Sequence, residues 1–420
     1  MNPKQQISSA VITAGMLAVI AVGSWWYHSR HPVAVAGAGS GEAVVSVTSP
    51  DDMGPGSLRE ALFVAAAARG RISVLLLARK VTLKTPLPPL MNPYGLRLVA
   101  QPAGAEIDAH DLPGGAVLDV AGPNTSIEGV VVRHCPGAAV LLRAAHFHMH
   151  ASVVDSCDVG VEVAANAADV LLEDDRFVND RVGVRFGAPN SNTAVVRNTF
   201  AHDTAAGLWA VRGDTGAPGG GDAIQVRDNH FTDNHAGVVA GNVPIVIEHN
   251  EFSANAPQAA VHLIGAGGVI RSNRIAGPAP QGIVAENARD ALIEGNELHG
   301  LSSYALMLRG SAGAMVRGNR VADCASGMAF VLGDPEHPSS AVSNTIADPR
   351  LNAIDVIGDS PVLTDNEVLR PRALALRVTD YAQPGGRNVR AHPSLHGNNF
   401  RANTIGTVAP EPATAAVGRP

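Results

Sequence analysis

Apolar and polar residues alternate along short runs of this chain, and many of these runs end at an Asn. Ile245 and Ile247, for example, precede Asn250 by five and three positions. Alternation with a period of two residues places such side chains on one face of a strand. The pattern therefore predicts short β-strands and not helices.

The Asn belongs to a repeated unit in which one free residue and then an apolar residue follow it. Copies of the unit begin at Asn198, Asn229, Asn250, Asn273, Asn296, Asn319, Asn344 and Asn366, and Asp175 begins a variant. From Asn250 to Asn319 each step is 23 residues. A fixed period of about 20–50 residues is typical of repeat architectures. Asn tolerates a left-handed backbone, and stacked Asn amides can hydrogen-bond from one repeat to the next.

A Gly or Ala opens a second alternating run in each repeat, as in Gly160 to Val163. Coils with two or three short strands, each stacked on the same strand of the next coil, predict an all-β fold, a single-stranded right-handed parallel β-helix. Residues 116–400 amount to about twelve coils and, at ~4.8 Å per coil, to a rod of roughly 60 Å. We expect a cap and opening coils over residues 45–115 and a flexible tail over 401–420.

The composition agrees with a narrow coil interior. Hydrophobic residues make up 46% of the chain but aromatic residues only 4%, as expected if Val, Ile, Leu and Ala fill the coils. The net charge is −7 and no basic run occurs, which argues against a nucleic-acid partner. An acidic polymer would need a local group of arginines.

The amino-terminal segment is apolar and free of charge from residue 7 to residue 27. About 20 such residues span a bilayer, and Trp25, Trp26 and Tyr27 stand where an aromatic belt would lie. Two interpretations remain open: a signal anchor over residues 1–31, which the length of the run favours, or a signal peptide cleaved after Ala36. Both place the β-helix on the periplasmic or extracellular side, after a linker over residues 32–44.

A helix start precedes the coils. Ser57 and Glu60 have the spacing of a capping box before the helical run Ala61–Arg69. The string from Gly54 to Leu62 resembles a GSLREAL-type sequence that opens many secreted bacterial β-helix proteins, where it contributes to the amino-terminal cap. The resemblance implies structural roles for Arg59 and Glu60.

The period, the Asn ladder and the Gly-apolar strand resemble the pectate-lyase-like superfamily of parallel β-helix repeat proteins, over roughly residues 100–400. That superfamily contains lyases, hydrolases, epimerases and non-enzymatic members, among them periplasmic proteins that serve copper-enzyme maturation. The resemblance therefore implies a fold and not one chemistry.

Cys135 and Cys157 lie 22 residues apart and precede equivalent strands. Stacked coils bring them to ~4.8 Å, within the range of about 4.4–6.8 Å that a disulfide needs. Either a disulfide or two stacked reduced thiols fit this spacing.

The residue between the two apolar positions of the Gly-opened strand points outward. Read coil by coil, this column contains Leu141, Glu162, Arg185, Trp209, Val239, His262, Val284 and Met307. Trp209 can stack on a sugar ring, and Arg181, Arg185 and Arg212 can hold uronate carboxylates through paired hydrogen bonds. A long insertion, from Arg212 to Asp222, follows the Trp209 strand. The alternative is an ordinary solvated face.

Lyase or C5-epimerase chemistry requires a neutralised carboxylate and a base that removes the C5 proton. His202, His235 and His262 are candidates for the base, and Asp203 for the residue that orients it. A hydrolase would instead need two carboxylates, for which Glu162, Asp203 and Asp233 are candidates. Asp233 is also a candidate for substrate binding.

A second candidate site contains five residues, His146, His148, His150, Asp169 and Glu173. The strand register predicts that the three His side chains point outward and that the two carboxylates lie one coil further on. Imidazoles and carboxylates bind Zn²⁺ or Cu²⁺, so a divalent metal ion is the possible cofactor here. Simple His–carboxylate pairs between strands are the alternative.

We therefore expect a membrane-anchored, extracytoplasmic β-helix that binds or modifies a uronate-containing polysaccharide by lyase or C5-epimerase chemistry. The alternatives are a non-catalytic scaffold in polysaccharide export or periplasmic maturation, and a metal-handling role.

Overall fold

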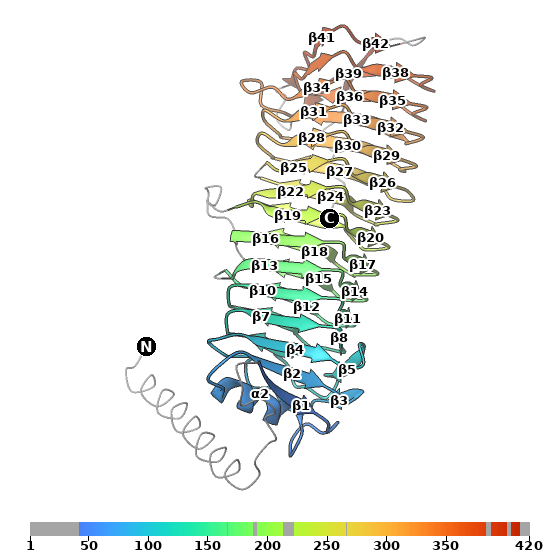
Figure 1. The fold of residues 1–420 in the computed structure, drawn as a ribbon. Helices are drawn as coiled ribbons and strands as arrows, with labels where there is room; N and C mark the ends of the chain where they lie inside the picture. Colours follow the sequence, from blue (N-terminus) through green and yellow to red (C-terminus); the bar gives the residue numbers. More distant parts are fainter. Residues whose placement is uncertain are drawn as a thin grey trace, which may run out of the picture.

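The computed structural model describes residues 42–165, 167–187, 191–212, 222–265, 267–383, 388–400 and 405–411. Its strands form three long sheets that run along one axis, as the stacked arrows of Figure 1 show. Neighbouring strands within a sheet are separated by a whole coil of the chain, and their pairing is parallel. Among the described strands the exception is the antiparallel pair of Leu376–Ala382 with Asn388–Val389. The solenoid has about 13 turns, against the twelve or so that the repeat predicts.

We name the sheets A, B and C. Sheet A contains β1 (Ala43–Val47), β2 (Ile72–Leu76), β4 (Leu96–Ala100), β7 (Thr125–Glu128), β10 (Phe147–His150), β13 (Ala168–Glu173), β16 (Ser191–Val196), β19 (Ile224–Arg227), β22 (Ile245–Glu248), β25 (Val269–Arg271), β28 (Leu292–Glu294), β31 (Met315–Arg317), β34 (Ser340–Val342), β37 (Val362–Thr364) and β41 (Ser394–His396).

Sheet B contains β3 (Lys80–Thr82), β5 (Ala105–Asp108), β8 (Val130–Arg133), β11 (Val153–Asp155), β14 (Arg176–Val178), β17 (Thr199–Ala201), β20 (His230–Thr232), β23 (Glu251–Ser253), β26 (Arg274–Ala276), β29 (Glu297–His299), β32 (Arg320–Ala322), β35 (Thr345–Ala347), β38 (Glu367–Leu369) and β42 (Asn399–Phe400).

Sheet C contains β6 (Leu118–Val120), β9 (Ala138–Leu142), β12 (Val159–Val163), β15 (Val182–Phe186), β18 (Ala206–Val211), β21 (Val238–Gly241), β24 (Ala259–Ile264), β27 (Gln281–Glu286), β30 (Tyr304–Arg309), β33 (Ser326–Val331), β36 (Ile354–Ile357), β39 (Leu376–Ala382) and β40 (Asn388–Val389). We expect a loose tail after residue 400, but β43 (Ile405–Glu411) instead pairs in parallel with β39.

The core is one continuous apolar column inside the coils. Four of its largest side chains come from the Asn-x-apolar units and the Asp175 variant: Phe177, Phe200, Phe231 and Phe252 stack with ring centroids 5.0, 4.7 and 4.8 Å apart. These separations match the spacing between parallel strands. One ring per coil therefore fills the same place in successive layers.

The predicted Asn ladder is confirmed, and it is buried. Asn273 shows the pattern: its Oδ1 accepts from the backbone N–H and the side chain of Asn250, and its Nδ2 donates to the Ile247 carbonyl and to Asn296 Oδ1. Asn250 and Asn296 repeat these bonds on either side. Each amide thus bonds to backbone N–H and C=O groups at the turn, which have no partner in the strand pairing.

A second buried column follows the strands of sheet B and is not apparent from the repeat unit. In it Asp180, Asp203, Asn234 and Asn255 each lie one coil apart, and each side-chain oxygen accepts the backbone N–H of the residue in the preceding coil. Asp175 occupies the first column in the same way, with its Oδ1 on the Ser152 N–H. Carboxyl groups therefore stand at three places where other coils carry an amide.

The amino-terminal helix α2 (Leu58–Ala67) begins three residues before the expected run Ala61–Arg69. The capping box is confirmed: Ser57 Oγ accepts from the Glu60 N–H, and Glu60 Oε2 accepts from the Gly56 N–H. The helix contacts β1 and β2, the first strands of sheet A. Arg59 bonds to Asp52 and to the loop at Thr85, a structural set of contacts.

Cys135 and Cys157 form a disulfide between adjacent coils, with their Cα atoms 4.3 Å apart. Cys324 is free and buried.

Within the described ranges no helix has the length and apolar character of a membrane span. The run at residues 7–27, for which an anchor is expected, lies outside those ranges.

Candidate functional site

The outward column on sheet C has the predicted register. Strand pairing places Leu141 beside Glu162, Glu162 beside Arg185, and Arg185 beside Trp209. It continues through Val239, His262, Val284 and Met307. The eight side chains therefore form one row on the outer face of the sheet.

The arginines near the start of this row are paired with carboxylates. Arg185 Nη2 lies 2.9 Å from Glu162 Oε2, and both side chains are about one-third exposed, at 33% and 31%. Arg181 makes two bonds to Asp158, of 2.5 and 3.1 Å. A uronate carboxylate would have to displace an internal partner to reach either guanidinium.

Trp209 belongs to a small apolar patch outside the coil core. It packs with Val211 and Ile264 against Val239, whose exposure is only 2% although it lies in the outward row. We call this group of four residues the Trp209 patch. It gives the outer face of sheet C a half-buried aromatic ring on a rigid support, the arrangement on which sugar rings stack.

Asp203 does not lie on this face. Its side chain is 1% exposed and occupies the second buried column, where its Oδ1 accepts the Asp180 N–H. Burial, together with the nearby Asp180 carboxyl, raises its pKa to about 9. The expectation that Asp203 orients a catalytic His or acts as a hydrolase carboxylate is therefore wrong, because the turn position that fits an Asn points into the coil.

The other candidate residues on turns lie beside the row, and among the described residues they make no contact with one another. His202 and Asp233 are exposed on turns with left-handed backbone, and His235 is half-buried. Arg212 is half-buried, and its backbone N–H bonds to the Gly241 carbonyl. Residues 213–221 of the expected insertion lie outside the described part of the chain.

His262 has a carboxylate partner that the sequence did not reveal. Its Nε2 lies 3.4 Å from Glu286 Oε2, and Arg309 Nη1 lies 3.9 Å from Glu286 Oε1. Burial lowers the pKa of His262, which outweighs the opposite effect of Glu286. The imidazole is therefore neutral near pH 7, as a base must be. Glu286 was missed because it lies two positions past the apolar Val284, outside the row that the repeat defines.

A buried polar cluster lies further along the same face. Asp355 is 1% exposed and accepts from Tyr304 Oη at 2.9 Å, Arg377 Nε at 2.6 Å and Asn352 Nδ2 at 2.9 Å. Tyr304 spans two coils to make its bond, and these three donors compensate the buried carboxylate. This cluster joins consecutive coils and was not recognisable from the repeat.

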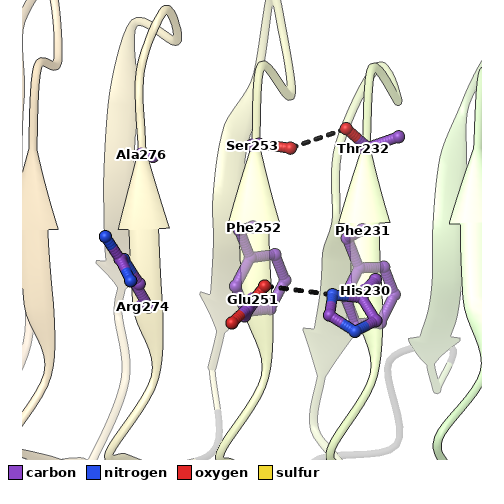
Figure 2. Close-up of a pocket in the computed structure, with 8 residues that line it drawn as sticks. All are labelled: His230, Phe231, Thr232, Glu251, Phe252, Ser253, Arg274 and Ala276. Atoms are coloured by element: carbon purple, nitrogen blue, oxygen red, sulfur yellow. Dashed lines mark hydrogen bonds and ion pairs between the residues drawn. The ribbon is translucent and has the colours of Figure 1, made fainter.

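A shallow hollow of about 270 Å³ lies over β20, β23 and β26 of sheet B, and Figure 2 shows the side chains that line it. On one side His230 Nδ1 lies 3.2 Å from Glu251 Oε2, with Arg274 on the next strand. On the other side the hydroxyls of Thr232 and Ser253 are 2.6 Å apart. The hollow is polar on both sides and lies away from the Trp209 row.

The His-rich strand β10 has the predicted arrangement on sheet A. His150 is in register with Glu173, and His146 Nδ1 lies 3.1 Å from Asp169 Oδ2. His148 Nε2 lies 3.3 Å from Glu173 Oε2. One ring nitrogen each of His148 and His150 and one Glu173 oxygen lie within 4.8 Å of one another. His146 and Asp169 are not part of that group.

This geometry agrees with the comparison to known families. The family model described as "Right handed beta helix region" matches residues 217–369. The match and the three stacked sheets together show the fold of this chain, a right-handed parallel β-helix. No curated protein sequence matches it.

Several solved structures share the fold of this β-helix. The catalytic unit of a GH87 α-1,3-glucanase from Streptomyces thermodiastaticus has a TM-score of 0.54 at 15% identity, covering 89% of this chain and 72% of the glucanase. A DFA-IIIase from Arthrobacter chlorophenolicus A6 has a TM-score of 0.53 at 11% identity, over 69% and 89% of the two chains. The tailspike of E. coli bacteriophage HK620, solved with a pentasaccharide, has a TM-score of 0.50 at 13% identity, over 84% and 76%. At these identities the likeness concerns the fold.

Proposed function

We propose that this β-helix binds a uronate-containing polysaccharide along the outer face of sheet C and modifies it by lyase or C5-epimerase chemistry. The observation that carries the proposal is the position of the Trp209 patch beside His262. Ile264 of the patch lies two residues from His262 on the same strand. An aromatic platform and a neutral His with a carboxylate partner lie between Arg185 on one side and Arg309 on the other, and together they make one extended binding face.

His262, one of the three candidates considered from the sequence, is the base in this proposal. It takes the C5 proton of a uronate, and Glu286 stabilises the imidazolium that forms. In a lyase the electron pair then forms the C4–C5 double bond as the C4–O bond breaks, and the leaving oxygen takes a proton. In an epimerase a proton returns to C5 from the opposite side. Arg309 or Arg185 would hold the substrate carboxylate after leaving its internal partner.

The saccharide class is supported by the fold relatives, whose names include a glucanase and a tailspike bound to a pentasaccharide. The acidic character of the substrate rests on the arginines of this chain alone. We further propose that the protein lies outside the cytoplasm, anchored through residues 7–27. The disulfide between Cys135 and Cys157 supports that location, since disulfides persist in oxidising compartments.

A non-catalytic binding scaffold is the second candidate. The observation in its favour is that Arg185 and Arg181 are each neutralised by a carboxylate of the preceding coil. Such ion pairs stabilise the outer face of the sheet, but they leave no unpaired guanidinium to bind a substrate carboxylate. In that case the Trp209 patch would bind the glycan and His262 would have no chemical role.

One experiment separates these candidates. The full chain is incubated with a panel of uronate polymers while ultraviolet absorbance reports unsaturated products and mass spectrometry in deuterated water reports exchange at C5. Binding is measured in parallel by affinity electrophoresis. We expect His262→Gln to abolish turnover and retain binding, and Trp209→Ala to weaken binding. His230→Gln, on sheet B, is the matched control and should change neither.

Binding that depends on Trp209, without turnover on any polymer, would establish the scaffold. If no uronate polymer binds, the proposal for an acidic polysaccharide is wrong.

A further inference from the structure

The outer face of sheet A carries a cluster that the proposed glycan face does not use. We propose that His148, His150 and Glu173 form a binding site for one divalent transition-metal ion, Zn²⁺ or Cu²⁺. The site is separate from the Trp209 patch, since it lies on a different sheet. Its test therefore does not depend on the polysaccharide proposal.

The distances already suit two of the three ligands. In a tetrahedral site with metal–nitrogen bonds of about 2.0–2.1 Å, the ligand atoms stand roughly 3.3 Å apart. His148 Nε2 and Glu173 Oε2 are 3.3 Å apart. The third ligand atom, on His150, lies within 4.8 Å of both. A rotation of one side chain on a rigid strand would complete three-coordinate binding, with water as the fourth ligand.

Among the three proposed ligands, His150 has a ring nitrogen, Nδ1, that is shielded from solvent and makes no hydrogen bond within the described part of the chain. The nearest carboxylate oxygen, Asp174 Oδ2, is 3.6 Å away, which is beyond hydrogen-bond range. An imidazole held in this way keeps a lone pair that a metal ion can take.

Arg197 fixes the position of the Glu173 carboxylate. Arg197 contacts Glu173 through Oε1 and bonds to both oxygens of Asp174. Since Arg197 takes Oε1, Oε2 is left on the His148 side. Partners of this kind orient metal ligands in known sites.

The choice of ion follows from the donors. Two imidazoles and one carboxylate suit Zn²⁺ and Cu²⁺ and do not suit Ca²⁺ or Mg²⁺, which require sets of oxygen ligands. The neighbouring pair of His146 with Asp169 makes only one imidazole–carboxylate contact. It thus supplies a control of the same chemistry on the same strand.

The test is calorimetric titration of the full chain with ZnCl₂ and with CuCl₂. We expect one ion per chain and a loss of affinity greater than about tenfold in each of His148→Ala, His150→Ala and Glu173→Gln, since even an orienting partner typically contributes that much. His146→Ala should bind as the parent does. MgCl₂ should give no heat.

The circular dichroism spectrum of each variant verifies that the fold is intact. The proposal is overturned if no ion binds at one per chain, or if the three variants bind as tightly as His146→Ala does. The latter result would mean an adventitious ion only.

Discussion

Three carboxylic acids occupy places in the buried columns where neighbouring coils carry an amide. Each of Asp175, Asp180 and Asp203 uses Oδ1 as an acceptor, and Oδ2 is shielded without a partner. Burial raises the pKa of all three, to about 8 for Asp180 and about 9 for Asp203. A protonated carboxyl resembles an Asn amide in shape and can donate from Oδ2. We infer that these residues are neutral in the folded protein near pH 7.

The sign of the pH dependence follows from these directions. A folded-state pKa of about 9 lies far above the unfolded value of about 3.9. The stabilisation from Asp203 is therefore complete below pH ~4 and is lost as the pH rises toward 9, with a slope of at most ~1.4 kcal/mol per pH unit.

Asp203→Asn should remove this part of the slope. An Asn there can donate permanently, as Asn234 does to the Phe200 carbonyl. The variant should be more stable than the parent at pH 8 and no more stable at pH 4. Urea unfolding at both pH values measures this. Asp233→Asn, on an exposed turn, is the control. Equal slopes for parent and Asp203→Asn would show that Asp203 is ionised in the fold.

His262 gives a second prediction at this scale. Because burial lowers its pKa, the imidazole stays neutral to more acidic pH than the usual value of about 6.5. If His262 is the base, turnover should persist to more acidic pH than an ordinary imidazole would allow, and fall only below that. Glu286→Gln removes the carboxylate that raises the pKa, so the acidic limb should move to still lower pH while turnover drops. A profile that does not respond to Glu286→Gln would exclude this pair.

At the scale of elements, the Asn columns and the disulfide join neighbouring coils. Asn273 makes four buried hydrogen bonds to two adjacent coils. Asn273→Ala leaves backbone groups unsatisfied, and each such group costs about 1–3 kcal/mol. We expect a loss of at least ~3 kcal/mol in the free energy of unfolding. Arg274→Ala, next in sequence and exposed, should cost less than about 0.5 kcal/mol. Similar losses in the two variants would contradict a stabilising ladder.

The disulfide closes a loop of 22 residues between β8 and β12. A cross-link over a loop of this length contributes about 3 kcal/mol in the chain-entropy account. Reduction, or the double substitution Cys135→Ser and Cys157→Ser, should lower the free energy of unfolding by roughly that amount. Cys324→Ala tests the buried free thiol separately. Thiol counting on the unfolded, unreduced chain should find one group; three would mean that the bridge does not form.

At the scale of the whole molecule, the prediction concerns the amino-terminal segment. If residues 7–27 anchor the protein, the full chain should sediment with membranes and resist extraction by high salt. Replacing residues 1–31 by a cleavable export signal should release a folded protein with its disulfide formed. If the expressed protein is instead recovered in the soluble fraction, with a chain that begins after Ala36, the segment is a cleaved signal peptide.

The sequence alone determined the all-β coil, the positions of the Asn ladder, the outward row on sheet C and the pairing of His150 with Glu173. All of these follow from a local period, because side chains alternate along a strand and a constant step stacks like on like. Only the tertiary structure decided that Asp203 points inward, that Glu286 stands beside His262, and that Tyr304 reaches Asp355. Glu286 and Tyr304 make contacts outside the repeated Asn-x-apolar unit, and Asp203 stands in a second buried column that this unit does not include. At these places the direction of each side chain depends on its neighbours.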